Sequence, residues 1–426
     1  MNVSDLRTTA TLIFREAVAA ADPKRSLRTA LQKHPLPSLC DGRIILIAFG
    51  KASIALMEEA LDHIPAGTQY QAIAVTNYEN FQTIEGCEVH ASGHPVPDEN
   101  GAKAAARVID ILKNASANDF ILTLISGGGS ALLPAPRKGL TLQDKIDTNQ
   151  VLLQNGYDIT EINMIRQHLS ELKGGGLAQM APNSTIKSFI ISDVIGDDLR
   201  VIASGPTVSP IASKETAADL IKSRGHWLML PNAVQTVLSN PDDGPPHRSG
   251  AEVTNTLICS NRQSLLAMQD ASSSFDVQIL NFALDGDVAK AADVIAGDIQ
   301  RNLKNGAQAF IWGGETTVTL RGKGKGGRNQ ELALRVSEKL SNLSGDWVFM
   351  SAGTDGRDGP TDAAGGIVDA GTIARLSQNG QSLADFLNQS DSYTALSQSG
   401  DLLITGGTGT NVADVQLFLR IPTPAT

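Results

Sequence analysis

Residues 120–133 constrain the fold of this chain more than any other stretch, because an apolar run there stops at three consecutive glycines. Five of its first six residues are apolar and the sixth is Thr123, a pattern that favours a strand buried on both faces of a parallel sheet. The loop that follows consists of small residues, Ser126, Gly127, Gly128, Gly129 and Ser130. Glycines let backbone N–H groups approach a ligand, and a helix beginning at Ser130 would add its dipole. We therefore predict an anion-binding loop, with a plain strand-to-helix turn as the alternative.

Further apolar runs alternate with helical patterns along the chain, which is typical of α/β proteins with parallel sheets. The runs that read as strands cover residues 43–50, 71–76, 120–125, 185–194, 256–259, 277–280, 309–313, 347–352 and 401–405. Residues 239–251 are rich in proline, glycine and charge, as expected of a linker. We expect two α/β domains with largely parallel sheets, over residues 1–240 and 250–426, and we allow residues 1–43 to pack on the second domain.

The composition excludes several classes of partner. The 426 residues carry a formal net charge of −10 and only 4% aromatic side chains, so we expect neither nucleic acid nor an anionic membrane as a partner. Cys40, Cys87 and Cys259 have no metal-binding spacing and suit a reducing compartment. We see no signal peptide and no apolar run long enough to span a bilayer. These features predict a cytoplasmic protein that acts on small molecules and could form a homo-oligomer.

Charged residues collect where the predicted strands end, which is where open α/β sheets bind their ligands. Lys51 follows the strand at residues 43–50, and Arg328 lies in a cationic, glycine-rich segment. Asp193, Glu315 and Asp355 lie at the ends of three further strands. Cations, glycine loops and carboxylates that can hold Mg²⁺ are the components of phosphoryl transfer. For Lys51 alone, an ordinary solvated lysine is the alternative.

Two further loops contain candidate binding residues. His94 stands between Gly93 and Pro95, so its loop is rigid enough to position an imidazole, although a loop histidine is more often structural. Lys173 precedes Gly174 and two more glycines. That order suits a helix C-cap or, alternatively, a second loop whose backbone approaches a ligand.

Several familiar active-site motifs are absent from the sequence. It contains no phosphate-binding Gly-x-x-x-x-Gly-Lys-Ser/Thr motif, no protein-kinase motif set and no Gly-x-Ser-x-Gly elbow around Ser130. Gly322, Gly324 and Gly327 do match a dinucleotide pattern, but lysines fill its variable positions and no well-placed acid follows. We therefore keep an NAD(P) site only as a weak alternative.

The chain resembles the glycerate 2-kinase family, which pairs a glycerate kinase N-terminal domain with a MOFRL domain. The resemblance runs from near residue 6 to about residue 415 and rests on ordered strings of residues. These strings lie at residues 50–52, 93–97, 126–131, 166–175, 192–194, 204–207, 313–315, 326–331 and 353–365.

The resemblance implies ATP- and Mg²⁺-dependent phosphorylation of D-glycerate to 2-phosphoglycerate in a cleft between a Rossmann-like N-terminal domain and a second α/β domain. It places the family's essential lysine on Lys51 and its essential arginine on Arg328. Because family members have also been labelled hydroxypyruvate reductase, an NAD(P)-dependent reductase is the alternative. Our hypothesis assigns catalysis to Lys51, Arg328 and Asp193, ATP phosphates to Ser126, Gly127, Gly128, Gly129, Ser130, Lys173 and Gly174, substrate to His94, Glu315, Asn329 and Asp355, and metal to Asp193, Glu315 and Asp355.

Overall fold

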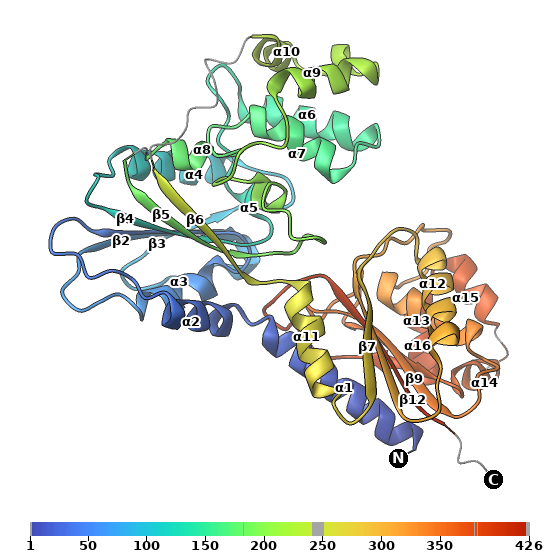
Figure 1. Ribbon diagram of the computed structural model, residues 1–426. Helices are drawn as coiled ribbons and strands as arrows, with labels where there is room; N and C mark the ends of the chain where they lie inside the picture. Colours follow the sequence, from blue (N-terminus) through green and yellow to red (C-terminus); the bar gives the residue numbers. More distant parts are fainter. Residues whose placement is uncertain (1, 182, 241–250, 379, 381, 423–426) are drawn as a thin grey trace. The chain divides into compact units, whose positions relative to one another are not determined.

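The computed structural model describes residues 2–181, 183–240, 251–378, 380 and 382–422, and the chain divides into two compact units (Figure 1). The N-terminal unit comprises Pro23–Ser192 and Asp197–Ile258. The C-terminal unit comprises Met1–Asp22, Asp193–Gly196 and Cys259–Thr426. Most of the linker expected at residues 239–251 lies outside the described residues. Within the described ranges, no helix is both long and apolar enough to cross a membrane.

A six-stranded sheet in the order β3-β2-β1-β4-β5-β6 forms the centre of the N-terminal unit. Its strands are β1 (Ile44–Phe49), β2 (Tyr70–Asn77), β3 (Glu88–Ser92), β4 (Phe120–Ile125), β5 (Thr185–Ile191) and β6 (Glu252–Cys259). The first five pair in parallel, as the continuous apolar runs predict. The strand order reverses between β1 and β4, so the sheet has a topological switch point there.

Helices cover both faces of this sheet, and a second helical layer packs beyond it. Figure 1 shows α3 (Ser53–Leu61) on one face and α4 (Glu99–Lys113) on the other, as right-handed crossovers require when the strand order reverses. The helical layer has its own core around Leu152, Ile165 and Val234. The remaining helices are α2 (Pro23–Lys33), η1 (Tyr78–Asn80), α5 (Gly129–Leu132), α6 (Leu142–Gln154), α7 (Ile159–His168), α8 (Gly176–Gln179), η2 (Ile202–Ser204), α9 (Lys214–Ser223), η3 (Trp227–Met229) and α10 (Asn232–Ser239).

The C-terminal unit also contains a six-stranded sheet, in the order β11-β10-β9-β12-β8-β7. Its strands are β7 (Asp276–Leu284), β8 (Gln308–Gly314), β9 (Asp346–Gly353), β10 (Gly365–Asp369), β11 (Leu402–Leu403) and β12 (Asp414–Ile421). Only β7 and β8 pair in parallel, whereas β12 lies antiparallel to both β8 and β9. The expectation of a largely parallel second sheet is therefore wrong. A strand buried on both faces is apolar in either direction, so the pattern does not reveal its direction.

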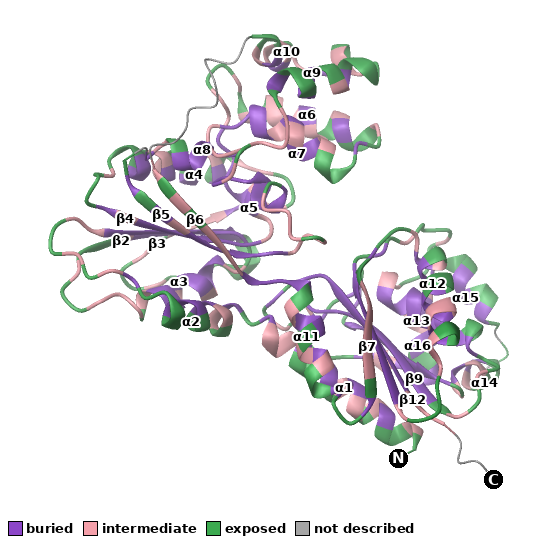
Figure 2. Cartoon of the chain, viewed as in Figure 1, coloured by how far each residue is buried: buried purple, intermediate pink, exposed green. Residues whose placement is uncertain are grey.

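Alternating side chains of each central strand supply two cores, one on each face of this second sheet. On β8, Phe310 and Trp312 pack toward α12 and α13, while Ala309 and Ile311 pack toward α1 and α11. Figure 2 shows the buried strands and the exposed outer surfaces of these helices. The helices are α1 (Val3–Ala20), α11 (Asn261–Ala271), α12 (Val288–Asn302), α13 (Arg328–Lys339), α14 (Thr372–Ser377), α15 (Leu383–Gln389) and α16 (Ser392–Ser399).

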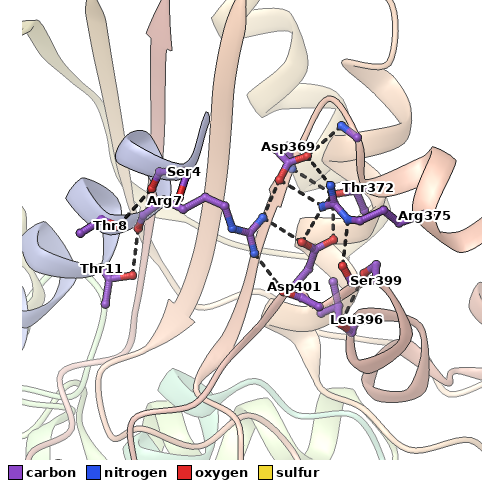
Figure 3. Close-up of polar contacts among 12 residues, drawn as sticks. Ser4, Arg7, Thr8, Thr11, Asp369, Thr372, Arg375, Leu396, Ser399 and Asp401 are labelled. Carbon is purple, nitrogen blue, oxygen red and sulfur yellow. Dashed lines mark hydrogen bonds and ion pairs between the residues drawn. The ribbon is translucent and has the colours of Figure 1, made fainter. Parts of the chain in front are cut away.

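A buried ion-pair network ties α1 to this unit, although α1 is distant from it in sequence (Figure 3). Nη1 of Arg7 lies 2.6 Å from Asp369 and 2.8 Å from Asp401, and Arg375 pairs with the same two carboxylates at 2.9 and 2.7 Å. Thr372 donates a further hydrogen bond to Asp401. Because two arginines share two almost fully buried carboxylates, neither carboxylate is buried without a counter-charge.

Candidate functional site

The loops after β1 and β4 meet at the switch point of the N-terminal sheet. These two strands are paired in register from end to end. The backbone N–H of Lys51 donates to the carbonyl of Gly127 at 2.9 Å, and the N–H of Ala52 donates to Oγ of Ser126 at 3.1 Å. The structure therefore places Lys51 directly beside the glycine loop, at the edge where doubly wound sheets bind ligands.

Gly128 brings His94 into the same cluster. It has a φ of +84°, and a Cβ added there would lie 3.3 Å from Nε2 of His94 and 3.3 Å from Cγ of Lys51. Burial, followed by the positive charge of Lys51, lowers the pKa of His94 against the opposing effect of Glu79. The imidazole is therefore neutral at neutral pH and can accept as well as donate a hydrogen bond.

Ser130 and Gly174, both predicted to bind phosphate, already use their polar groups within the protein. Oγ of Ser130 lies 2.7 Å from Oγ of Ser204, which donates to Asn163 at 2.7 Å. The N–H of Gly174 donates to the carbonyl of Ser204 at 3.1 Å. In contrast, the N–H groups of Gly127 and Gly128 have no acceptor among the described residues. These two N–H groups, rather than the flanking residues, are available to an anion.

A cavity of about 200 Å³ adjoins the glycine loop. Three cations line it, namely Lys145 from α6, Arg166 from α7 and Lys173 from the loop after α7. The other lining residues are His94, Pro95, Pro97, Gly128, Ser130, Ala131, Pro134, Thr148, Asn149 and Leu169. None of the described lining residues is a carboxylate, so the cavity is suited to an anion.

Within the part of the chain that the structure describes, the hydrogen bonds of these three cations go to neutral oxygens. Nζ of Lys173 donates to the carbonyl of Ser130 at 2.6 Å, Nζ of Lys145 donates to the carbonyl of Leu169 at 3.1 Å, and Arg166 donates to the Asn149 side chain. Burial lowers the pKa of Arg166 to about 10 and, with the charge of Arg166, lowers that of Lys145 to about 7. Burial and both neighbouring cations also lower the pKa of Lys173 well below its ordinary value. No carboxylate among the described residues forms an ion pair with Lys145, Arg166 or Lys173.

In the C-terminal unit, Arg328 is held by two carboxylates. Nε and Nη2 donate to Asp414 at 2.6 and 3.0 Å, and Nη1 lies 2.9 Å from Glu315. The Asp414 side chain is 1% exposed and that of Arg328 is 33% exposed. Burial opposes the charge of Arg328, but the hydrogen bonds and negative charge of Asp414, followed by Glu315, raise its pKa. Arg328 therefore stays positively charged, is held in place by two carboxylates and is partly exposed to solvent.

Asn329, predicted to bind substrate, lies inside the protein. It is 1% exposed, and its Oδ1 accepts a hydrogen bond from Ser351 at 2.6 Å. The N–H groups of Asn329 and Gln330 donate to the carboxylate of Asp358 at 3.1 and 2.8 Å. Burial raises the pKa of Asp358 to about 6 in spite of these hydrogen bonds. The start of α13 thus binds the protein's own carboxylate.

Asp193 and Asp355, two of the predicted metal ligands, lie within electrostatic reach of the third, Glu315. Burial, followed by the negative charges of Asp414, Asp193 and Asp355, raises the pKa of Glu315, whereas Arg328 lowers it. Oδ1 of Asp355 accepts from the backbone of Arg357 at 2.9 Å. No three or more His, Cys, Asp or Glu side chains in the described ranges are grouped closely enough to hold a metal ion. The side chains could hold Mg²⁺ only if one or two carboxylates bind it and water and substrate phosphates provide the remaining ligands.

The glycines of the dinucleotide-like pattern serve packing within the C-terminal unit. A Cβ at Gly322 would lie 2.6 Å from Cα of Gln389, and the N–H of Gly324 donates to the carbonyl of Gln389 at 2.8 Å. The N–H of Lys325 donates to Asp391 at 3.0 Å. Because these groups contact the chain itself, this segment does not form an open loop for a pyrophosphate.

Sequence reasoning missed Lys145 and Asp414. Lys145, Thr148 and Asn149 share one face of α6, so helical spacing was a usable signal. Asp414 is the first residue of β12, a strand that the sequence pattern did not predict. Only the pairing of β12 within the sheet brings Asp414 to Arg328.

Comparisons with known proteins agree along the length of the chain. A family model described as a domain of unknown function (DUF4147) matches residues 9–239, and the MOFRL family model matches residues 308–414. A D-glycerate 2-kinase of Thermotoga maritima is 37% identical over 427 residues, which cover 98% of this chain and 99% of that protein. A crystal structure of a glycerate kinase from Thermotoga maritima has a TM-score of 0.90 at 36% identity, covering 98% of this chain and 100% of that one. A protein of Agrobacterium vitis with the provisional name hydroxypyruvate reductase is 37% identical over 418 residues, 96% of this chain and 93% of its own.

Proposed function

The chain belongs to the glycerate kinase family, and from this we propose that it transfers the γ-phosphoryl group of ATP to the 2-hydroxyl of D-glycerate. One observation carries the proposal. The glycine loop, Lys51 and His94 form a single cluster at the switch point of a parallel sheet. This is where an α/β enzyme of this topology binds phosphate-bearing ligands. The choice of the 2-hydroxyl is supported by the name of the Thermotoga relative.

We assign the binding of the transferred phosphoryl group to Lys51 and to the N–H groups of Gly127 and Gly128. Lys51 is exposed and has no ion pair with a described residue, so its charge is free to meet a phosphate. The two N–H groups have no described acceptor of their own. Backbone donors fixed in this way stabilise charge as it develops on the transferred group without having to reorganise. Oγ of Ser126 accepts a hydrogen bond from the N–H of Ala52 and so connects the glycine loop to the loop after β1.

Within the C-terminal unit we assign catalysis to Arg328, which Asp414 orients as a fixed cation suited to phosphate charge. One or two of Asp193, Glu315 and Asp355 would hold Mg²⁺. The ion would supply positive charge that offsets the charge of the phosphate oxygens.

The reaction is balanced without any further reactant. The 2-hydroxyl oxygen of glycerate forms a bond to the γ-phosphorus as the bond from that phosphorus to the bridging oxygen of ADP breaks. The hydroxyl proton passes to a carboxylate or to solvent. We assign the acceptor role to Asp193 or Asp355, and we assign Glu315 to the ion pair with Arg328.

The test is formation of ADP that depends on D-glycerate, with the product identified by proton-coupled phosphorus NMR. A phosphate on the methine carbon couples to a single proton and gives a doublet, whereas a phosphate on the terminal carbon gives a triplet. A doublet supports a 2-kinase. A triplet would correct the position, and ADP formation that ignores glycerate would refute the proposal.

The reductase alternative is examined in the same preparation with hydroxypyruvate and NADH or NADPH. We expect no oxidation of either cofactor, because the dinucleotide-like glycines pack against Gln389 and Asp391. Oxidation that requires hydroxypyruvate would establish the alternative.

We further propose a cytoplasmic location. Cys40, Cys87 and Cys259 form no disulfide, which suits a reducing compartment. Burial raises the pKa of Cys87 to about 12, so this thiol is not poised for redox chemistry. Fractionation of cells that express a tagged chain provides the test.

A further inference from the structure

The function proposed above gives no role to Lys145, Arg166 and Lys173, the three cations that line the cavity. Building on the proposed function, we propose that this cavity binds the carboxylate of the acceptor and so makes the enzyme select an acid over a neutral polyol. Lys173, assigned from the sequence to ATP phosphates, becomes a ligand of the acceptor. Lys145 and Arg166 become specificity-determining residues.

The size of the cavity favours a small acid. Its volume of about 200 Å³ is below the roughly 300–1,000 Å³ of pockets that enclose drug-sized ligands. A volume of this size suits a three-carbon hydroxy acid better than a whole nucleotide. Pro95, Pro97 and Pro134 form part of the wall, so the cavity cannot easily widen.

The positive charge of the cavity favours the binding of an anion. Three cations reach it from three different segments, and their hydrogen bonds within the protein all go to neutral oxygens. Partly buried cations without a counter-charge destabilise a protein, and each of these three has a lowered pKa. A carboxylate that enters the cavity would compensate for this cost and would favour the protonated form of Lys145.

The position of the cavity connects the carboxylate to the reaction. His94, Gly128 and Ser130 line the cavity, and Gly128 and His94 also contact the Lys51 cluster. An acid whose carboxylate lies among the cations therefore directs its hydroxyl carbon toward the glycine loop, where the phosphoryl group is held. This arrangement excludes glycerol, which has the hydroxyls of glycerate and no carboxylate.

The test compares Lys145→Met with the control Lys103→Met, which removes an exposed lysine from α4. We expect Lys145→Met to raise the KM for D-glycerate about tenfold or more, as is usual when a hydrogen bond to a charged group is lost. The KM for ATP should stay within about twofold of its value in the unmodified chain, because the loss of a contact to ATP would raise it about tenfold. Lys145→Arg, which restores the charge, should recover most of the affinity, and thermal unfolding verifies that each variant is folded. The control should match the unmodified chain.

The outcomes are distinct. A raised KM for ATP with an unchanged KM for glycerate would mean that the cavity binds the nucleotide, and no change in either would place the cavity outside the reaction. Calorimetric titration with D-glycerate and with glycerol separates this proposal from the proposed function. Glycerate binding that is lost in Lys145→Met supports the cavity even if the chain forms no ADP. An unmodified chain that binds neither compound, or binds both equally, overturns it.

Discussion

Nε of Arg328 lies 2.6 Å from Oδ2 of Asp414, and Nη2 lies 3.0 Å from Oδ1. The buried carboxylate therefore accepts two hydrogen bonds from the guanidinium. Bidentate pairs of this kind fix direction as well as charge. The third nitrogen, Nη1, is turned toward Glu315. Asp414 thus acts as a positioning residue for the cation that we assign to catalysis.

Replacing that carboxylate should misplace Arg328. We expect Asp414→Asn to lower kcat on the order of 10- to 100-fold, because the amide breaks the bidentate pair and removes its charge. Steady-state kinetics, with the melting temperature recorded in parallel, provides the measurement. A variant that melts earlier but keeps its kcat would show that Asp414 has only a structural role.

The two cations themselves should matter more. Lys51→Met and Arg328→Met should each lower kcat by about 10²-fold or more if they stabilise charge in the transition state. Lys323→Met, which removes an exposed lysine a few residues before Arg328, is the matched control and should leave kcat unchanged. Turnover close to normal in both test variants would remove these residues from the chemistry.

Gly128 offers a test of the cluster that carries the proposed function. Gly128→Ala should reduce kcat, because its Cβ would lie 3.2 Å from Cδ2 of His94 and 3.3 Å from Cγ of Lys51. Gly139→Ala is the control, since Gly139 has a similar φ of +92° but no neighbour within 4 Å. Both variants should lose about 1 kcal/mol of stability from the strained backbone. Equal kinetics in the two variants would contradict the importance of the contact.

The network around Arg7 predicts that the N-terminal helix stabilises the C-terminal unit. Arg7→Met should lower the free energy of unfolding by about 1–3 kcal/mol, less than for a fully isolated buried pair because Arg375 still pairs with both carboxylates. Urea denaturation at neutral pH measures this change. Arg15→Met, on the same helix and outside this network, is the control.

The network should also show a dependence on pH. Burial opposes ionisation of Asp369, but Arg375, the backbone of Gly371 and Arg7 lower its pKa overall. A carboxylate whose folded pKa is lowered contributes stability above its unfolded pKa of about 3.9, and this stability is lost as the pH falls through the folded value. The difference between Arg7→Met and the unmodified chain should therefore shrink below about pH 4. A difference that stays constant to pH 2 would contradict this explanation.

Lys145 should influence stability at the alkaline end. Its pKa of about 7 in the folded chain means that folding releases a proton between about pH 7 and the unfolded value near 10.4. Stability therefore rises with pH in that window, by up to about 1.4 kcal/mol per pH unit. Lys145→Met should lose the part of this slope that Lys145 contributes, while Lys173 keeps its own contribution, and it should be the more stable chain at pH 7.5. Unfolding at pH 7.5 and 9.5 would test this. An identical slope in both chains would show that this amine titrates normally.

Local pattern was enough to predict β1, β2, β4 and β5 of the N-terminal sheet, but it missed β3 and assigned β6 to the second domain. The apolar runs at Ile44–Phe49 and Phe120–Ile125 can be buried only in a two-sided sheet, and each stops at a glycine or a serine. The cluster of Lys51 with the glycine loop follows from these strands, because the carboxyl ends of neighbouring parallel strands lie at one edge.

Tertiary structure alone decided which groups are paired and which are available. Asp414 meets Arg328 only because β12 inserts between β8 and β9, and Asn329 is buried because Asp358 and Ser351 close around the start of α13. Lys145 lines a cavity because α6 packs near the loop of Lys173. A sequence carries the period of a helix or strand, which local sterics determine, whereas long-range pairing and desolvation depend on residues far apart in the chain and exist only once it has folded.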